Sequence, residues 1–262
     1  NAGGSADDRA VDIAINSTGD RIYVTGNCGP QTVSFHSSDG SVVNRSPVGS
    51  SDYFVAKLDA ATGIFLSAGM SGATSSGSRS NKYAEGIDVA ADGRAFVCGG
   101  IAACGTGSLA GVSISDKTSC SSPKIGFIAR YDSLCTLQAA IIPSSTNSSC
   151  TDESISDIHV QPNTAVQDAG NIVVSGYTGN LTALGTTVVG VPNRLSSYYA
   201  VYSPNFTSGN TTPVRANYLS QGSGISSAVA MDKNGFVYLT HNSSDSLFQS
   251  CDTFVSTGDQ DA

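Results

Sequence analysis

The chain has 262 residues and a formal net charge of −8, and its 13 Lys and Arg residues form no basic cluster, which argues against a nucleic-acid partner. Hydrophobic residues make up 39% of the chain, enough for a packed core, and only 13% are charged. No run of 18 apolar residues occurs, so we expect no membrane-spanning helix. Abundant Ser, Thr and Gly without a long amphipathic helical pattern predict strands and turns.

A turn followed by a strand occurs four times along the chain. Each copy joins a turn glycine to a short β-branched or aromatic run, and the first three copies close on a second glycine. The copies cover residues 19–26, 93–99, 170–176 and 235–241, and His241 replaces the last glycine in the fourth. The pattern predicts a buried strand that ends abruptly at this position.

Three further strands are expected around each of the first three copies and two around the fourth, and the strands of a unit are called a, b, c and d. The a strands precede the turn glycine, at 11–15, 87–91, 158–160 and 228–231. The c strands follow, at 52–59, 126–132, 197–203 and 252–259. The d strands are expected at 64–68, 137–142 and 214–219, and the last unit has none.

The repeat predicts one domain over residues 1–262, with units at 8–82, 83–153, 154–224 and 225–262 and a period of about 70 residues. Four consecutive antiparallel strands repeated in tandem are typical of propeller blades, because each blade must stack on its neighbours to bury both faces. We therefore expect an all-β fold: a β-propeller of about four blades of four antiparallel strands, with the last blade incomplete.

The first unit resembles a known family of repeats. Its Ile-Tyr-Val-Thr-Gly at 22–26, followed by Asp-Tyr-Phe-Val-Ala-Lys-Leu-Asp at 52–59, is similar to the SBBP-type β-propeller repeat. The resemblance covers nearly the whole chain, is weakest at 197–203, and departs from the family in its longer b–c loops. It implies a propeller fold in an extracellular or surface protein, but no single activity and no site residues.

The two ends of the sequence suggest how a last blade is completed. Residues 1–4 resemble residues 67–70 at the end of a d strand, and the last unit lacks its own d strand. Residues 1–7 are thus expected to complete the last blade and close the ring, or to complete a blade of a neighbouring molecule and build a fibre. The sequence leaves both alternatives open.

Seven Asn-x-Ser/Thr sequons indicate N-glycosylation, and all are expected between strands, where a glycan has room. Asn16 is placed in an a–b turn and Asn147 in a d–a connection. The b–c loops and a c–d turn hold the others: Asn44, Asn180, Asn242, Asn205 and Asn210. Sequons and cysteines together indicate a secreted, oxidised protein located outside the cell or at its surface.

Seven cysteines allow several disulfide pairings. Cys104 with Cys120, and Cys135 with Cys150, would each close a short loop. Cys28 and Cys251 both lie on b–c loops and would latch the first blade to the last in a closed ring. Cys98 is expected to be a small buried hydrophobic residue, although an odd count also allows an intermolecular bridge.

No catalytic, cofactor or metal site is predicted. Three acidic stretches are candidates for calcium binding: Asp7-Asp8, Asp92-Gly93 and Asp232–Gly235. The last two lie at a–b turns, where Asp, Asn and Gly are favoured for backbone reasons, so we expect turns there. His159 is expected to be structural, and His36 and His241 to be solvated. Asp152 and Glu153 are adjacent rather than convergent, although a glycosidase-type carboxylate pair assembled from separate blades would escape sequence analysis.

The sequence therefore favours a non-enzymatic extracellular glycoprotein. The leading hypothesis is a structural or adhesive propeller that associates with itself or with other extracellular proteins and glycans, as the repeating subunit of a filament or surface coat. One alternative is a secreted carbohydrate-binding or carbohydrate-active propeller. The other is a propeller portion of a larger surface receptor or adhesin.

Overall fold

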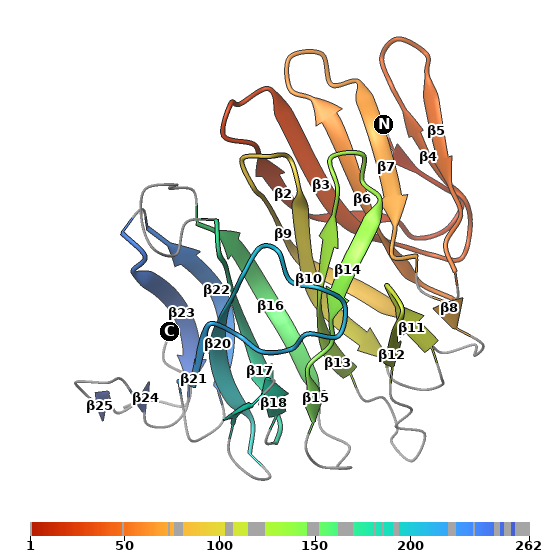
Figure 1. Ribbon diagram of the computed structural model, residues 1–262. Helices are drawn as coiled ribbons and strands as arrows, with labels where there is room; N and C mark the ends of the chain where they lie inside the picture. The colour runs from red at the N-terminus through yellow and green to blue at the C-terminus, as the bar shows by residue number, and fades with distance from the viewer. Residues whose placement is uncertain are drawn as a thin grey trace.

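A computed structural model describes residues 2–48, 50–72, 74–75, 81–102, 107–114, 124–145, 152–161, 170–180, 182–184, 186–190, 194–219, 224–232, 234–243, 247–248 and 253–254. Every regular element in these residues is a β-strand, which confirms the all-β prediction. The strands form successive antiparallel sheets that stand side by side in chain order (Figure 1).

Each of the four units contributes one main sheet. The main sheets of the first three units have four strands each, and that of the fourth unit has two described strands. The first sheet contains β2 (Arg9–Ile15), β3 (Arg21–Cys28), β6 (Asp52–Asp59) and β7 (Phe65–Met70). The second contains β9 (Lys82–Val89), β10 (Ala95–Ala102), β13 (Lys124–Tyr131) and β14 (Leu137–Ile141). The third contains β16 (Glu153–Val160), β17 (Ile172–Thr178), β20 (Ser196–Tyr202) and β21 (Arg215–Tyr218), and the fourth β22 (Gly224–Met231) and β23 (Val237–Ser243).

Each long b–c loop of the first three units holds an extra hairpin, which the sequence analysis did not predict. The hairpins are β4 (Val33–His36) with β5 (Val42–Arg45), β11 (Gly107–Leu109) with β12 (Val112–Ile114), and β18 (Thr182–Leu184) with β19 (Thr187–Val189). A two-residue strand pairs with each hairpin: β1 (Ala2–Gly3), β8 (Thr74–Ser75) and β15 (Ser144–Ser145). In the last unit, β24 (Leu247–Phe248) pairs with β25 (Thr253–Phe254), and the rest of the c strand expected at 252–259 lies outside the described residues.

The N-terminal residues pair within the first unit. Ala2 and Gly3 pair with Phe35 and Ser34 of β4, so β1 belongs to the hairpin sheet of the first unit and not to the fourth sheet. Completion of a blade of a neighbouring molecule by residues 1–7 stays a prediction.

A β-bulge in all four units explains the repeated second glycine. The bulged residues are Val11, Glu85, Ser156 and Ser227 of the a strands. Beside the bulge, a Cβ on Gly26, Gly99 or Gly176 would clash with a carbonyl oxygen of the adjacent a strand. The expectation that strand b ends at this glycine is therefore wrong, because β3, β10 and β17 each continue beyond it to Cys28, Ala102 and Thr178.

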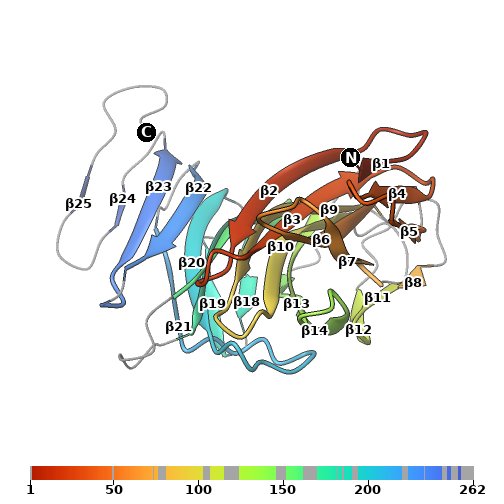
Figure 2. The same cartoon turned by 90° about the horizontal axis from the view of Figure 1, so that it is seen from above.

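The sheets form a fan, which Figure 2 shows from above. Separate hydrophobic clusters fill the spaces between the first and second, second and third, and third and fourth sheets. Another lies on the outer side of the first sheet, where Phe35 of β4 packs edge-on against Phe54 and Phe65. We call the side of a sheet that faces the preceding sheet its leading face, and the side that faces the following sheet its trailing face.

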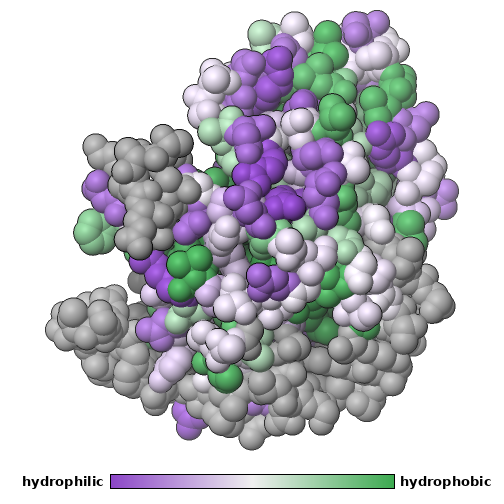
Figure 3. Space-filling model, viewed as in Figure 1, coloured by the Kyte–Doolittle hydropathy of each residue, from purple (hydrophilic) through white to green (hydrophobic). Residues whose placement is uncertain are grey.

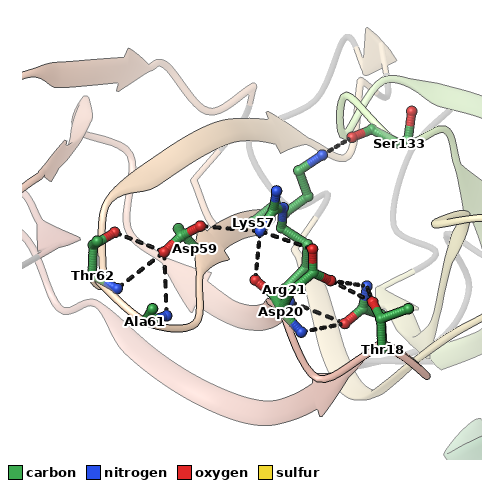
Figure 4. A network of polar contacts seen from close by, with 9 residues as sticks. Thr18, Asp20, Arg21, Lys57, Asp59, Ala61, Thr62 and Ser133 are labelled. Carbon is green, nitrogen blue, oxygen red and sulfur yellow. Dashed lines mark hydrogen bonds and ion pairs between the residues drawn. The ribbon is translucent and has the colours of Figure 1, made fainter.

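Polar contacts fix the turns at one end of the first sheet (Figure 4). Arg21 donates to Asp59 Oδ2 at 3.0 Å and lies 3.1 Å from Asp20 Oδ2. Lys57 reaches across to the second sheet and donates to the backbone oxygen of Ser133 at 2.6 Å.

Hydrophilic side chains cover much of the upper part of the molecule in Figure 3, with smaller apolar patches among them.

Candidate functional site

Carboxylates join the a strands of neighbouring sheets, which are β2, β9, β16 and β22. Asp12 accepts a hydrogen bond from the backbone amide of Ile87 at 2.8 Å, Asp88 from that of Val160 at 2.7 Å, and Asp157 from that of Val229 at 2.7 Å. Burial raises the pKa of Asp88 and of Asp157, while these backbone hydrogen bonds act in the opposite direction. Three carboxylates thus connect the four sheets in series.

His159 extends this connection across the third sheet. Its Nδ1 lies 3.3 Å from Asp88 Oδ2 of the second sheet, and its Nε2 lies 3.1 Å from the backbone oxygen of Met231 in the fourth. A carbonyl oxygen can only accept, so Nε2 carries a proton. The predicted structural role of His159 is therefore consistent with its position between sheets.

The first and second sheets make the most detailed contact. Tyr23 is 1% exposed, and its hydroxyl donates to the backbone oxygen of Gly93 at 3.1 Å. The side-chain amide of Asn27 bonds both the N–H of Ala84, at 2.8 Å, and its carbonyl, at 3.3 Å. Farther out, the ring of Tyr53 stacks on Phe127 with centroids 5.0 Å apart.

The leading face of the first sheet is exposed to solvent at positions that are buried in the second, third and fourth sheets. We call such an exposed face an open face. Ile13 and Ile15 are 63% and 58% exposed. The strand pairing makes the equivalent residues Ile87 and Val89, Ile158 and Val160, and Val229 and Met231, all of which are at most 8% exposed. A neighbouring cavity of about 250 Å³, lined among others by Val24, Phe35 and Phe54, continues this apolar surface.

The trailing face of the fourth sheet is open as well. Its residues are Ala228, Ala230, Tyr238, Thr240 and Asn242, and all are exposed, Tyr238 by 59%. The alternate residues Val229, Met231, Val237 and Leu239 pack toward the third sheet. Because both open faces are exposed, the first and fourth sheets do not cover each other in this structure.

A cavity of about 790 Å³ with both polar and apolar walls lies beside β2, β3 and β9. Arg9, Asp7 and Tyr83 line it. Nearby, Lys124 Nζ lies 5.7 Å from the centre of the Tyr83 ring. Partial burial raises the pKa of Glu85, against the lowering effect of Lys124 and Arg9. The cavity therefore combines an aromatic ring with charges of both signs.

Six of the seven predicted glycosylation sites are described, and they differ in exposure. Asn44, Asn205, Asn210 and Asn242 are exposed, although Asn44 and Asn242 lie in strands rather than loops. Asn16 is half-buried, and its Nδ2 donates to Thr18 and Asp20 in the a–b turn. Asn180 is only 1% exposed, which leaves no room for a glycan, so we no longer expect one there. Asn147 lies outside the described residues.

Three cysteines are described, and all are buried free thiols: Cys28, Cys98 and Cys135. The predicted bridges from Cys28 to Cys251 and from Cys135 to Cys150 are thus not formed here, and the proposed partners lie outside the described residues, as do Cys104 and Cys120. Burial raises the pKa of Cys28 to about 12. Cys98 is 0% exposed, which confirms its prediction as a small buried residue.

The remaining candidates have structural positions. Asp232 Oδ1 accepts from the amides of Asn234 and Phe236, as the turn interpretation predicted. Among the described residues, no group of three or more His, Cys, Asp or Glu side chains is placed to hold a metal ion. Burial lowers the pKa of His241, whose Nδ1 lies 2.9 Å from Ser197 Oγ, so its predicted solvation is wrong. His36 is exposed, as expected.

The residues that join the sheets were not predicted from the sequence. Asp12, Asp88 and Asp157 lie in largely apolar a strands. A charged residue in such a strand was the one sequence feature that could have indicated a buried partner. Comparison with known proteins adds no assignment: no protein-family model matches the chain, and no curated protein matches it significantly. The similarity to SBBP-type repeats therefore stays a prediction. In the described part of the chain, no helix is long and apolar enough to cross a membrane.

Proposed function

We propose that the chain is a secreted, N-glycosylated structural or adhesive protein, built as a segment of a β-propeller, that associates through its end sheets into an extracellular filament or coat. The open leading face of the first sheet carries this proposal. Exposing Ile13 and Ile15 at positions that are buried in the three other sheets is unfavourable unless another surface covers them.

Glycosylation fits the same function. Asn44, Asn205 and Asn210 are exposed, so a glycan has room at each of these sites. The dense sequons support an extracellular location.

The test is to isolate the secreted chain and measure its assembly by sedimentation velocity over a hundredfold concentration range, together with its intact mass. We expect large species that grow with concentration and a mass above that of the polypeptide. Only monomers at the highest concentration would overturn the assembly function, and an unmodified mass would overturn the glycoprotein.

The cavity beside β2, β3 and β9 supports carbohydrate binding as a second candidate function. Tyr83 offers a ring for stacking on a sugar, and Asp7 and Arg9 offer hydrogen-bonding groups. A glycan-binding screen of the chain and of Tyr83→Ala tests this. Binding that is lost in the variant supports the candidate, whereas no binding by the unaltered chain rejects it.

A further inference from the structure

We propose that the trailing face of the fourth sheet docks onto the leading face of the first sheet of a second copy of this chain, through the same type of contact that joins the first and second sheets within one copy. This inference rests on the proposed function, because it specifies the partner in the self-association. It commits to two particular faces and to a particular register.

The trailing faces of the first and fourth sheets carry the same side chains in the same register. The shared residues are Tyr, Thr and Asn at alternate positions: Tyr23, Thr25 and Asn27 in β3, and Tyr238, Thr240 and Asn242 in β23. Tyr23 lies opposite Ala14, and Tyr238 lies opposite Ala230, at the same distance from the bulge. The second and third sheets have Phe96 and Val173 at the Tyr position.

The receiving faces are equally alike. The second sheet receives Tyr23 and Asn27 with Ala84, Ile87 and Val89, and the equivalent residues of the first sheet are Ala10, Ile13 and Ile15. We therefore expect Tyr238 to cover Ile13 and Ile15 of the second copy. We also expect the amide of Asn242 to bond the backbone of Ala10, as Asn27 bonds Ala84.

The carboxylate link differs at this contact. In the second and fourth sheets, the backbone amide that donates to the carboxylate of the preceding sheet comes directly after Gly86 and Ala228, respectively. In the third sheet, Asp157 bonds the amide of Ile158 itself, and Asp88 bonds Val160 two residues farther on.

The first sheet follows the pattern of the third, because Asp12 bonds the amide of Ile13 itself at 2.8 Å. An incoming carboxylate should therefore bond Ile15, and it should come from the position equivalent to Asp88, which is Ala230 in the fourth sheet. The contact between copies thus lacks one hydrogen bond that the internal contacts have, and a substitution can supply it.

The proposal also changes the prediction for one sequon. Asn242 belongs to the sequon Asn242-Ser243-Ser244, and a glycan on its amide would prevent the contact with Ala10. We therefore expect Asn242 to be unmodified in the assembled protein. Because the two faces are different surfaces of one chain, repetition of the contact builds an open-ended filament unless it closes into a ring.

Sedimentation velocity of the secreted chain with Ile13→Asp and Ile15→Asp tests the docking face. Both side chains are largely exposed, so the variant should fold, with an unchanged circular dichroism spectrum. We expect it to be monomeric where the unaltered chain assembles. Leu134→Asp, at a 68% exposed residue in the turn between β13 and β14, should assemble normally. Assembly by the double variant would overturn this inference and leave the proposed function standing, whereas no assembly by the unaltered chain would overturn both.

Two matched substitutions test the register. Ala230→Asp should lower the dissociation constant of the contact about tenfold, because a carboxylate–amide hydrogen bond is gained. Ala228→Asp should not, because the Ile13 amide already bonds Asp12. Equal effects of the two variants, or a glycan on Asn242 in assembled material, would overturn the proposal. So would a structure of a longer form of the same polypeptide in which a further sheet covers the first.

Discussion

The carboxylate of Asp12 in the first sheet accepts a hydrogen bond from the backbone amide of Ile87 in the second, across 75 residues of sequence. Asp88 and Asp157 repeat this contact between the later sheets. The sheets are therefore joined by polar contacts of defined register as well as by apolar packing, and the stability of each contact can be measured separately.

Asp12→Ala should lower the free energy of unfolding by about 1–3 kcal/mol, because it leaves the amide of Ile87 without its acceptor between two packed sheets. Chemical denaturation measures the loss. Asp12→Asn keeps one acceptor oxygen and should cost less. Equal stability of the alanine variant and the unaltered chain would show that this contact contributes nothing.

Two adjacent glycines should respond differently to alanine. At Gly99 a Cβ would clash with the carbonyl oxygen of Tyr83, which cannot move without disturbing the bulge. At Gly100 its nearest neighbours would be side-chain atoms, Ser154 Oγ at 3.1 Å and Lys124 Cδ and Cβ at 3.6 and 3.8 Å. We expect Gly99→Ala to prevent folding or lower the melting temperature strongly, and Gly100→Ala to be mild. Similar melting temperatures for the two variants would contradict the role assigned to the bulge.

Asp157 should make stability depend on pH. Burial raises its folded-state pKa above 3.8, so the folded chain holds this proton more tightly than the unfolded chain. Its contribution is therefore complete below pH 3.8 and is lost as the pH rises through the folded pKa. Asp157→Asn should flatten the dependence of the free energy of unfolding on pH in that range. An unchanged slope would mean that the carboxyl group is not desolvated.

The three described thiols should resist alkylation in the folded chain. Cys28, Cys98 and Cys135 are at most 3% exposed, and burial raises the pKa of each. Mass spectrometry after iodoacetamide treatment should find them unmodified until denaturant is added. Modification of Cys28 in native conditions, or a Cys28 disulfide, would contradict the structure.

The sequence predicted the repeat well and its connections poorly. The alternation of apolar and polar residues located the part of each a strand that follows the bulge. Val11 and its three counterparts at the bulge shift this alternation by one residue, so the start of each strand was missed, and β9 and β16 begin five residues earlier than expected. The hairpin β4–β5 was not predicted, because a strand of four residues is too short to show a clear alternation of apolar and polar residues. The role of Asp12 could not be predicted, since its partner Ile87 lies in another sheet.

The same reasoning explains the partly correct glycosylation predictions. A sequon specifies a local sequence but not the tertiary burial of its Asn, and Asn180 is buried while Asn44 is exposed. Asn242 matched a sequon, but its equivalence to Asn27 became visible only when the strands were placed in register.

Cryo-electron microscopy of the assembled protein would show which surfaces of two copies meet. We expect a head-to-tail contact in which Tyr238 of one copy covers Ile13 and Ile15 of the next, with no glycan density on Asn242. An assembly in which these two isoleucines remain exposed to solvent would exclude the proposed contact between copies.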